Sequence, residues 1–186
     1  MAITPDGQTL VVRRDRGSGA AVSSAYLTLP LLPDSKAVAP QPLLESRVAM
    51  GQLSLSPDGK WAAYESSESG REEIFVVPFP KPDRKWQIST GGGTRPLWSR
   101  NGRELFYRDG DRLMAVPVQT NRAFRSGTAE MLVLGQRQYR PAYDVDRSGD
   151  RFLMLKLADT RPGEFNVVVN WFEELRRRAP ADGRRR

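Results

Sequence analysis

The segment that most resembles a metal-binding loop runs from Asp144 to Asp150 and reads Asp-Val-Asp-Arg-Ser-Gly-Asp. Asp144, Asp146 and Ser148 place oxygen atoms at alternating positions, and a glycine follows at the sixth, as in a calcium loop. The twelfth position is Leu155, where such a loop needs a bidentate glutamate, and we expect strands rather than helices on both sides. The segment also aligns with turns elsewhere in the chain, so a structural turn is favoured and a calcium site is the alternative.

Residues that could carry covalent or acid–base chemistry lack the usual partners. The chain has no histidine and no cysteine, so a serine nucleophile has no imidazole to activate it and thiolate chemistry is excluded. The carboxylate pairs Glu72/Glu73 and Glu173/Glu174 are adjacent in sequence. Neighbours on a strand or a helix do not face one another, so neither pair forms an acid–base dyad. We expect no catalytic residue and no cofactor in this chain.

A glycine run, Gly91-Gly92-Gly93-Thr94, superficially resembles a phosphate-binding loop. Such loops need a following helix whose N-terminus meets the anion. Here a strand is expected from Pro96 onward, so a connection between two sheets is favoured over a phosphate site. The Gly-rich loop, His-Arg-Asp and Asp-Phe-Gly motifs of protein kinases are absent from the sequence.

Two residues of the folded part are candidates for contact with a partner. Most aromatic side chains recur at repeat positions and are expected in the core. Trp98 lies near the start of a turn and could approach the mouth of a channel. Trp98 and Arg95 are therefore the candidate partner-binding residues in this region, with a core position still favoured for Trp98.

The net charge of +7 is concentrated at the C-terminus, where residues 176–186 contain six arginines and one aspartate. Arg184, Arg185 and Arg186 are therefore candidates for contact with phosphate backbones or anionic lipid. A solvated terminus is the favoured interpretation, and nucleic acid is not expected as a partner.

The elements that position these residues are strands joined by a repeated turn. The turn sequence occurs four times, as Ile3-Thr-Pro-Asp-Gly7, Leu55-Ser-Pro-Asp-Gly59, Trp98-Ser-Arg-Asn-Gly102 and Val145-Asp-Arg-Ser-Gly149. Three mostly apolar residues follow at the same offset after each glycine. A period of roughly 40–50 residues, with about four strands in each repeat, predicts a β-propeller.

The repeats predict an all-β chain, a partial β-propeller of about four blades made of four-stranded antiparallel sheets. A composition of 39% apolar and 27% charged residues is typical of a folded domain rather than a disordered one. The expected propeller spans residues 1–170, with blades at about 1–46, 47–90, 91–135 and 136–170. A capping box at Asn170–Glu173 predicts a short helix over 171–178, and residues 179–186 are expected to be a disordered basic tail.

The segment Leu55–Pro80, together with Trp86–Ser99 and Arg103–Tyr107, resembles the WD-like propeller repeat of TolB-type proteins. The ending Asn166–Leu175 is similar to the C-terminus of bacterial propellers that stand alone or follow a serine/threonine kinase domain and a membrane anchor. Complete members usually carry six or more blades. The resemblance therefore implies the C-terminal part of a larger propeller, and we expect its parent to begin further upstream.

The resemblance implies a noncatalytic module that binds a protein, a peptide or a small ligand, as the sensor or scaffold part of a receptor-like kinase. A propeller that accompanies a hydrolase of the peptidase type, and anion binding through the arginine tail, are the alternatives. The location would be periplasmic or otherwise extracytoplasmic for a membrane-anchored or TolB-type parent, and cytoplasmic otherwise. No run approaches the ~20 apolar residues of a membrane span.

An arc of four blades leaves sheet faces and edges uncovered, which is an aggregation hazard. We therefore expect the isolated chain to dimerise into a closed ring, to aggregate, or to need further blades for stability.

Overall fold

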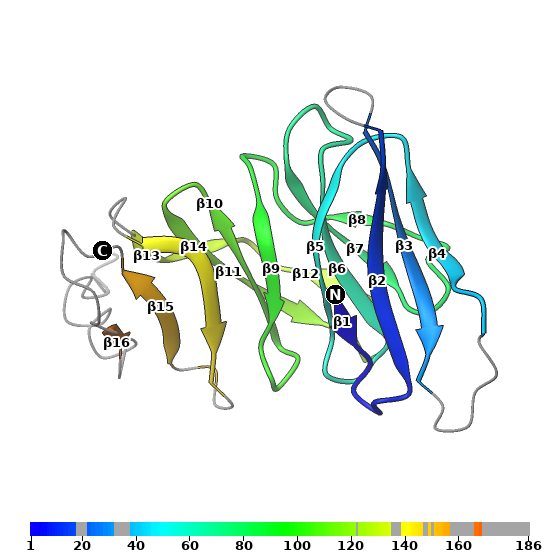
Figure 1. The fold of residues 1–186 in the computed structure, drawn as a ribbon. Helices are drawn as coiled ribbons and strands as arrows, with labels where there is room; N and C mark the ends of the chain where they lie inside the picture. Colours follow the sequence, from blue (N-terminus) through cyan, green and yellow to red (C-terminus); the bar gives the residue numbers. More distant parts are fainter. Residues whose placement is uncertain are drawn as a thin grey trace, which may run out of the picture.

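The computed structural model describes residues 1–17, 22–31, 38–121, 123–134, 139–146, 149, 151–156 and 166–168. Within these residues every regular element is a β-strand. The strands form four antiparallel sheets that follow one another along the chain and stand side by side as an arc (Figure 1). We call these sheets blades 1 to 4, in chain order.

The strands of each blade are antiparallel neighbours. Blade 1 contains β1 (Ala2–Ile3), β2 (Thr9–Arg16), β3 (Ser23–Pro30) and β4 (Gln41–Ser46). Blade 2 contains β5 (Met50–Leu55), β6 (Trp61–Ser66), β7 (Glu73–Pro78) and β8 (Trp86–Gln87). Blade 3 contains β9 (Thr94–Trp98), β10 (Glu104–Asp109), β11 (Arg112–Gln119), β12 (Arg125–Ser126) and β13 (Glu130–Leu134). The described part of blade 4 contains β14 (Tyr139–Val145), β15 (Phe152–Lys156) and β16 (Asn166–Val168).

The repeated turn joins the first and second strands of each blade through side-chain hydrogen bonds. The Ser56 hydroxyl accepts a hydrogen bond from the backbone N–H of Trp61 at 3.0 Å and donates one to Asp58. Thr4 and Ser99 make the same pair of bonds in blades 1 and 3. Because these bonds satisfy backbone groups next to the turn, the same short motif closes a hairpin in each of these blades.

The core lies between the blades rather than within one of them. Three clusters of buried apolar side chains each join two successive blades. Tyr26 of blade 1 packs with Tyr64 of blade 2, Ala63 of blade 2 with Trp98 of blade 3, and Phe106 of blade 3 with Phe152 of blade 4. Packing of each sheet on the next is the architecture of a β-propeller.

Blade 2 lies between two others, and its strands are accordingly apolar on both faces. Five of the six residues of β7 are buried, so this strand reads as a nearly continuous apolar run. The all-β propeller of about four blades is therefore confirmed. The helix expected over 171–178 and the basic tail over 179–186 lie outside the described residues, and the blade limits at 46, 90, 135 and 170 remain predictions.

Candidate functional site at the channel mouth

The first strands of the blades form the inner wall of the arc. β5 lies against both β1 and β9, and β9 lies against β14, although these strands belong to four different sheets. We call this surface the channel wall. The repeated turns lie at one end of it, at the bottom of Figure 1, and the connections between blades lie at the other end.

At the end with the connections, the channel wall borders a hollow of about 860 Å³. We call it the channel-mouth hollow. Its polar lining comes from three blades and includes Arg13, Gln52, Glu65, Glu72, Thr94 and Arg95. The sequence-predicted residue Arg95 thus lines a polar recess of the channel wall.

The backbone at Arg95 is in an unusual conformation. Its φ is 56°, and Arg95 is the one non-glycine residue with positive φ in the described part of the chain. A residue that precedes a proline, as Arg95 precedes Pro96, normally adopts an extended conformation. The pairing of β9 with β10 shifts register at this point, between Phe106 and Arg108, which marks a β-bulge. Such bulges redirect a side chain and are common next to functional sites.

Hydrogen bonds from two neighbouring blades hold this conformation. The backbone N–H of Arg95 donates to Glu65 Oε2 of blade 2 at 3.1 Å. Its carbonyl accepts a hydrogen bond of 2.8 Å from the hydroxyl of Tyr143 of blade 4. Burial raises the pKa of Tyr143 above its usual range, while the positive charges of Arg108 and Arg95 act against that rise. Tyr143 therefore stays a neutral donor at physiological pH.

The guanidinium of Arg95 has spare hydrogen-bonding capacity. Among the described residues its one side-chain contact is Nη1 donating to Gln52 Oε1 at 3.4 Å, whereas a guanidinium carries five N–H donors. The backbone is thus held from two sides, while the charged group points into the hollow with donors available to a ligand.

The carboxylate of Glu65 lies directly against the backbone of β5. A Cβ atom at Gly51 would collide with this carboxyl group, so a glycine is needed at that position. The hydroxyl of Tyr26 donates to the carbonyl of Gly51 at 3.0 Å from the other side. Blades 1, 2 and 3 therefore meet at the bulge of β5, between Met50 and Leu53.

The residue six positions after the turn glycine is charged in blades 1, 2 and 3, and in blades 1 and 2 it bonds to the next blade. Arg13, Glu65 and Arg108 all stand six residues after the turn glycine of their blade. Arg13 donates to the carbonyl of Met50 at 2.8 Å, as Glu65 accepts from the N–H of Arg95. Arg108 is 4% exposed, and its Nε has no hydrogen-bond partner within the part of the chain that the structure describes. Sequence reasoning missed this position, although its constant offset from the turn was a usable signal.

The other partner-binding candidate, Trp98, is not at the surface. Its side chain is 4% exposed and belongs to the cluster between blades 2 and 3. Its indole N–H donates to the carbonyl of Ser54 at 3.2 Å. This packing favours the core interpretation of Trp98, so the structure does not bring it together with Arg95 in the hollow. Arg184, Arg185 and Arg186 lie outside the described residues.

Of the calcium-loop candidates, Asp146 lies in the turn of blade 4 and Asp144 lies on the strand before it. Asp146 Oδ1 accepts a hydrogen bond from the N–H of Gly149 at 2.9 Å, so this aspartate stands where Ser56 and Ser99 stand in other blades. Asp144 is exposed on β14 and accepts from the N–H of Val145. Ser148 lies outside the described residues, within which no group of three metal-ligating His, Cys, Asp or Glu side chains occurs.

The glycine run lies between blades 2 and 3, where Ile88 to Gly93 connect β8 to β9. Glu73, only 1% exposed, holds this connection. Its carboxylate accepts hydrogen bonds from the Ser89 hydroxyl and the Gly92 N–H, and it pairs with Arg71 Nε at 3.1 Å. Glu73 is thus engaged in structural bonds, whereas Glu72 borders the channel-mouth hollow.

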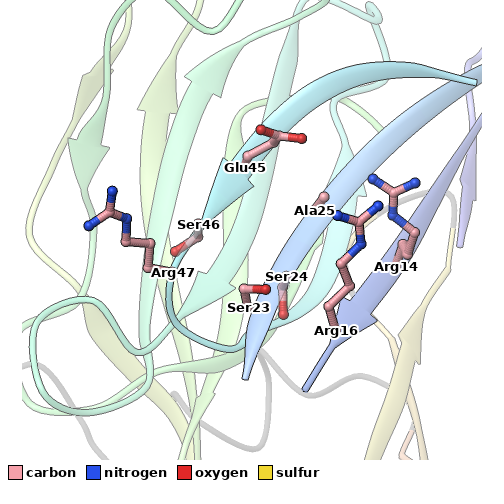
Figure 2. A pocket seen from close by; sticks show the side chains of 8 residues that line it. All are labelled: Arg14, Arg16, Ser23, Ser24, Ala25, Glu45, Ser46 and Arg47. Atoms are coloured by element: carbon pink, nitrogen blue, oxygen red, sulfur yellow. The ribbon is translucent and has the colours of Figure 1, made fainter. Parts of the chain in front are cut away.

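A second hollow, of about 320 Å³, lies on the outer side of blade 1, away from blade 2. Figure 2 shows Arg14 and Arg16 on β2 and Glu45 on β4, with Arg47 at its rim. It is not part of the channel wall.

Comparison with solved structures shows a β-propeller likeness. The chain matches TolB from Acinetobacter baumannii with a TM-score of 0.58 and 16% identity, covering 86% of this chain and 38% of TolB. It matches a TolB-like protein from Agrobacterium tumefaciens with a TM-score of 0.59 and 16% identity, over 89% of this chain and 62% of that one. A periplasmic gluconolactonase from Pseudomonas aeruginosa matches with a TM-score of 0.54 and 15% identity, over 89% and 54% of the two chains.

The TolB-like resemblance is therefore confirmed at the level of the fold. The chain spans 38% to 62% of the length of these proteins, and both a TolB and an enzyme are among them. No family model and no curated protein matches the sequence. No helix among the described residues is long and apolar enough to cross a membrane.

Proposed function

We propose that the chain is a noncatalytic binding module whose ligand occupies the channel-mouth hollow and contacts the guanidinium of Arg95. The ligand is a protein segment, a peptide or a small molecule that presents hydrogen-bond acceptors. In a larger parent, such as a receptor-like serine/threonine kinase, the module would serve as the sensor or scaffold part.

The observation that carries this proposal is the backbone of Arg95. A non-glycine residue in the left-handed region costs about 1–3 kcal/mol and persists only where its surroundings hold it there. Here Glu65 and Tyr143 supply that restraint from two different blades. The result is a fixed attachment point for a cationic side chain in a recess of the channel wall, and a fixed backbone lowers the entropy lost on binding.

The chemistry of the hollow supports binding rather than catalysis. The chain has no histidine to serve as a general base. Glu65 already accepts the backbone N–H of Arg95 and lies against Gly51. A hydrolase partner domain and anion binding through Arg184, Arg185 and Arg186 remain the alternatives, and the first of these would need a catalytic domain in a longer chain.

The proposal can be tested with a displayed library of short linear peptides panned against the whole chain. Peptides retained by the wild-type protein are then compared on Arg95→Ala and on Arg100→Ala by fluorescence anisotropy. Arg100 is a matched control, because it is an exposed arginine in the turn at the opposite end of the channel wall. We expect Arg95→Ala to weaken binding at least about tenfold, the loss of one charge-assisted hydrogen bond, and Arg100→Ala to leave it unchanged.

Enriched peptides that bind all three proteins equally would refute a role for Arg95. Peptides that lose affinity only when residues 179–186 are deleted would favour the arginine tail instead. Circular dichroism of each variant confirms that the sheets are retained.

A further inference from the structure

The two end blades of the arc expose faces that are buried between the other blades. We call the side of a blade that faces the next blade in the chain its forward face, and the opposite side its backward face. Blades 1, 2 and 3 each bury a forward face on the following blade. Within the described ranges, no further blade packs on the forward face of blade 4 or on the backward face of blade 1 (Figure 1).

The exposed fractions of equivalent residues show how the forward face of blade 4 differs from those of blades 1 to 3. Four residues after the turn glycine stand Val11, Ala63, Phe106 and Leu153 of blades 1 to 4. The first three are 0–1% exposed, because the next blade covers them, whereas Leu153 is 46% exposed. Two residues further on, Leu155 is 40% exposed on the same face. Blade 4 therefore presents two exposed leucines on its forward face, and Leu153 stands at a position that the other three blades bury.

On the backward face, blade 1 is the blade whose residues are more exposed than their equivalents in the other blades. Residues three and five positions after the turn glycine are 0–4% exposed in blades 2, 3 and 4, namely Ala62, Tyr64, Leu105, Tyr107, Phe152 and Met154. Their counterparts in blade 1 are Leu10 and Val12, which are only half-buried. Their cross-strand partners on β3 are Leu29, which is also half-buried, and Leu27, which is only 5% exposed, so the partly exposed apolar surface extends from β2 to Leu29.

The two faces carry charged residues of opposite sign next to their apolar residues. Arg14 and Arg16 continue the backward face of blade 1 beyond Val12, around the hollow shown in Figure 2, with Arg47 and Glu45 nearby. On blade 4, Asp144 is exposed and pairs across the strands with Leu153, which places it on the forward face. An acidic residue beside exposed leucines thus has a basic and apolar counterpart on blade 1.

We propose that the forward face of blade 4 docks on the backward face of blade 1 of a second copy of this chain. The contact repeats the blade-on-blade packing that already occurs three times within the chain. It joins two different surfaces, so it closes only if each copy uses both of its faces. Two copies joined at both contacts form a ring of eight blades, within the usual range for propellers.

The test uses the full chain and two variants, each of which introduces a charge on one of the two faces. Leu153→Lys places a charge on the forward face, and Val12→Lys places one on the backward face. Met131→Lys is the control, because Met131 is 49% exposed on the outer strand β13, away from both faces. Oligomeric state is measured by sedimentation velocity over a concentration series, with circular dichroism to verify the fold.

The wild-type chain and Met131→Lys should form dimers, and each face variant should dissociate at least about tenfold more readily, since a buried lysine opposes apolar contact. An equimolar mixture of Leu153→Lys and Val12→Lys should regain dimers, because one intact forward face then meets one intact backward face. That complementation does not depend on how much either substitution lowers monomer stability.

A wild-type chain that is monomeric at every concentration would overturn the proposal and leave these faces to other occupants, such as further blades of a longer protein. Dimers that neither face variant weakens would overturn it as well. Open-ended oligomers that both variants abolish would support the docking of the two faces and refute closure at two copies.

Discussion

At Arg95 the backbone and the side chain have separate roles. The backbone is fixed by Glu65 and Tyr143, and the guanidinium is left to face the channel-mouth hollow with one contact of 3.4 Å. Because the two roles are separate, the contribution of the backbone conformation to stability can be measured apart from the loss of the side chain.

Arg95→Gly should be more stable than Arg95→Ala by about 1 kcal/mol, because glycine adopts positive φ without the steric cost that alanine retains. Both variants lack the guanidinium, so their difference reports the backbone alone. The measurement is the free energy of unfolding in urea. Equal stabilities would mean that the left-handed conformation at residue 95 is not strained.

One acidic residue of the segment that resembles a calcium loop, Asp146, has a role in the turn of blade 4. Asp146 takes the place of a turn serine or threonine, and its carboxylate accepts a backbone N–H, as the hydroxyls of Ser56 and Ser99 do. Asp146 therefore has a structural role in the turn of blade 4, as the two serines have in blades 2 and 3.

At the scale of the elements, the turn between the first and second strands depends on one buried hydroxyl. Ser56 is 1% exposed and satisfies the N–H of Trp61. In Ser56→Ala this N–H loses its acceptor in a buried setting. We expect a loss of about 1–3 kcal/mol in the free energy of unfolding.

The control for this change is Ser69→Ala, in the exposed hairpin loop between β6 and β7. Its effect should stay within about 0.5 kcal/mol, as is usual for surface substitutions. Urea unfolding of both variants measures the difference, and similar small effects at both serines would contradict the role given to the turn hydroxyl.

The connection between blades 2 and 3 has one position where no side chain fits. A Cβ atom at Gly93 would collide with the Ser89 hydroxyl and lie 2.8 Å from Ile74 Cγ1, whereas at Gly91 it would meet no atom within 4 Å. Gly93→Ala should therefore destabilise the chain by about 1–3 kcal/mol through overpacking.

Gly91→Ala should be close to neutral, and thermal unfolding of the two variants compares them directly. Ser89 also donates to the buried Glu73, so a shift forced by Gly93→Ala disturbs the bonds that hold this connection. Equal melting temperatures for the two alanine variants would show that the connection can rearrange at no cost.

At the scale of the whole molecule, buried tyrosines link stability to alkaline pH. Burial raises the pKa values of Tyr26, Tyr64, Tyr107 and Tyr143 above their ordinary value of 10.0. The unfolded chain loses these protons near pH 10 while the folded chain keeps them. The folded state then binds more protons, so stability is fully present below pH 10 and is lost as the pH rises above it.

We expect the free energy of unfolding to fall above about pH 10, by at most about 1.4 kcal/mol per pH unit for each such tyrosine. Tyr26→Phe removes one of these groups and should reduce the slope, even though it also loses the bond to Gly51. Urea unfolding between about pH 8 and pH 11 gives the slope, and an unchanged slope in Tyr26→Phe would contradict this assignment.

The amino-acid sequence by itself determined the repeated unit. Turn residues such as Pro57, Asp58 and Gly59 set the backbone locally, and the apolar residues after them recur with the repeat, so both signals are readable along the chain. Strands, turns, the number of blades and the connection at Gly91–Gly93 therefore followed from local pattern. The absence of histidine and cysteine likewise limited the chemistry before any fold was known.

Only the tertiary structure decided which side chains meet. Glu65, Arg95 and Tyr143 belong to three blades and lie 30 and 48 residues apart along the chain, so no local pattern brings them together. The positive φ of Arg95 arises from those contacts and from a bulge, against the preference of a residue before proline. The exposure of Leu153, beside equivalents that are buried, likewise depends on which faces a neighbouring blade covers.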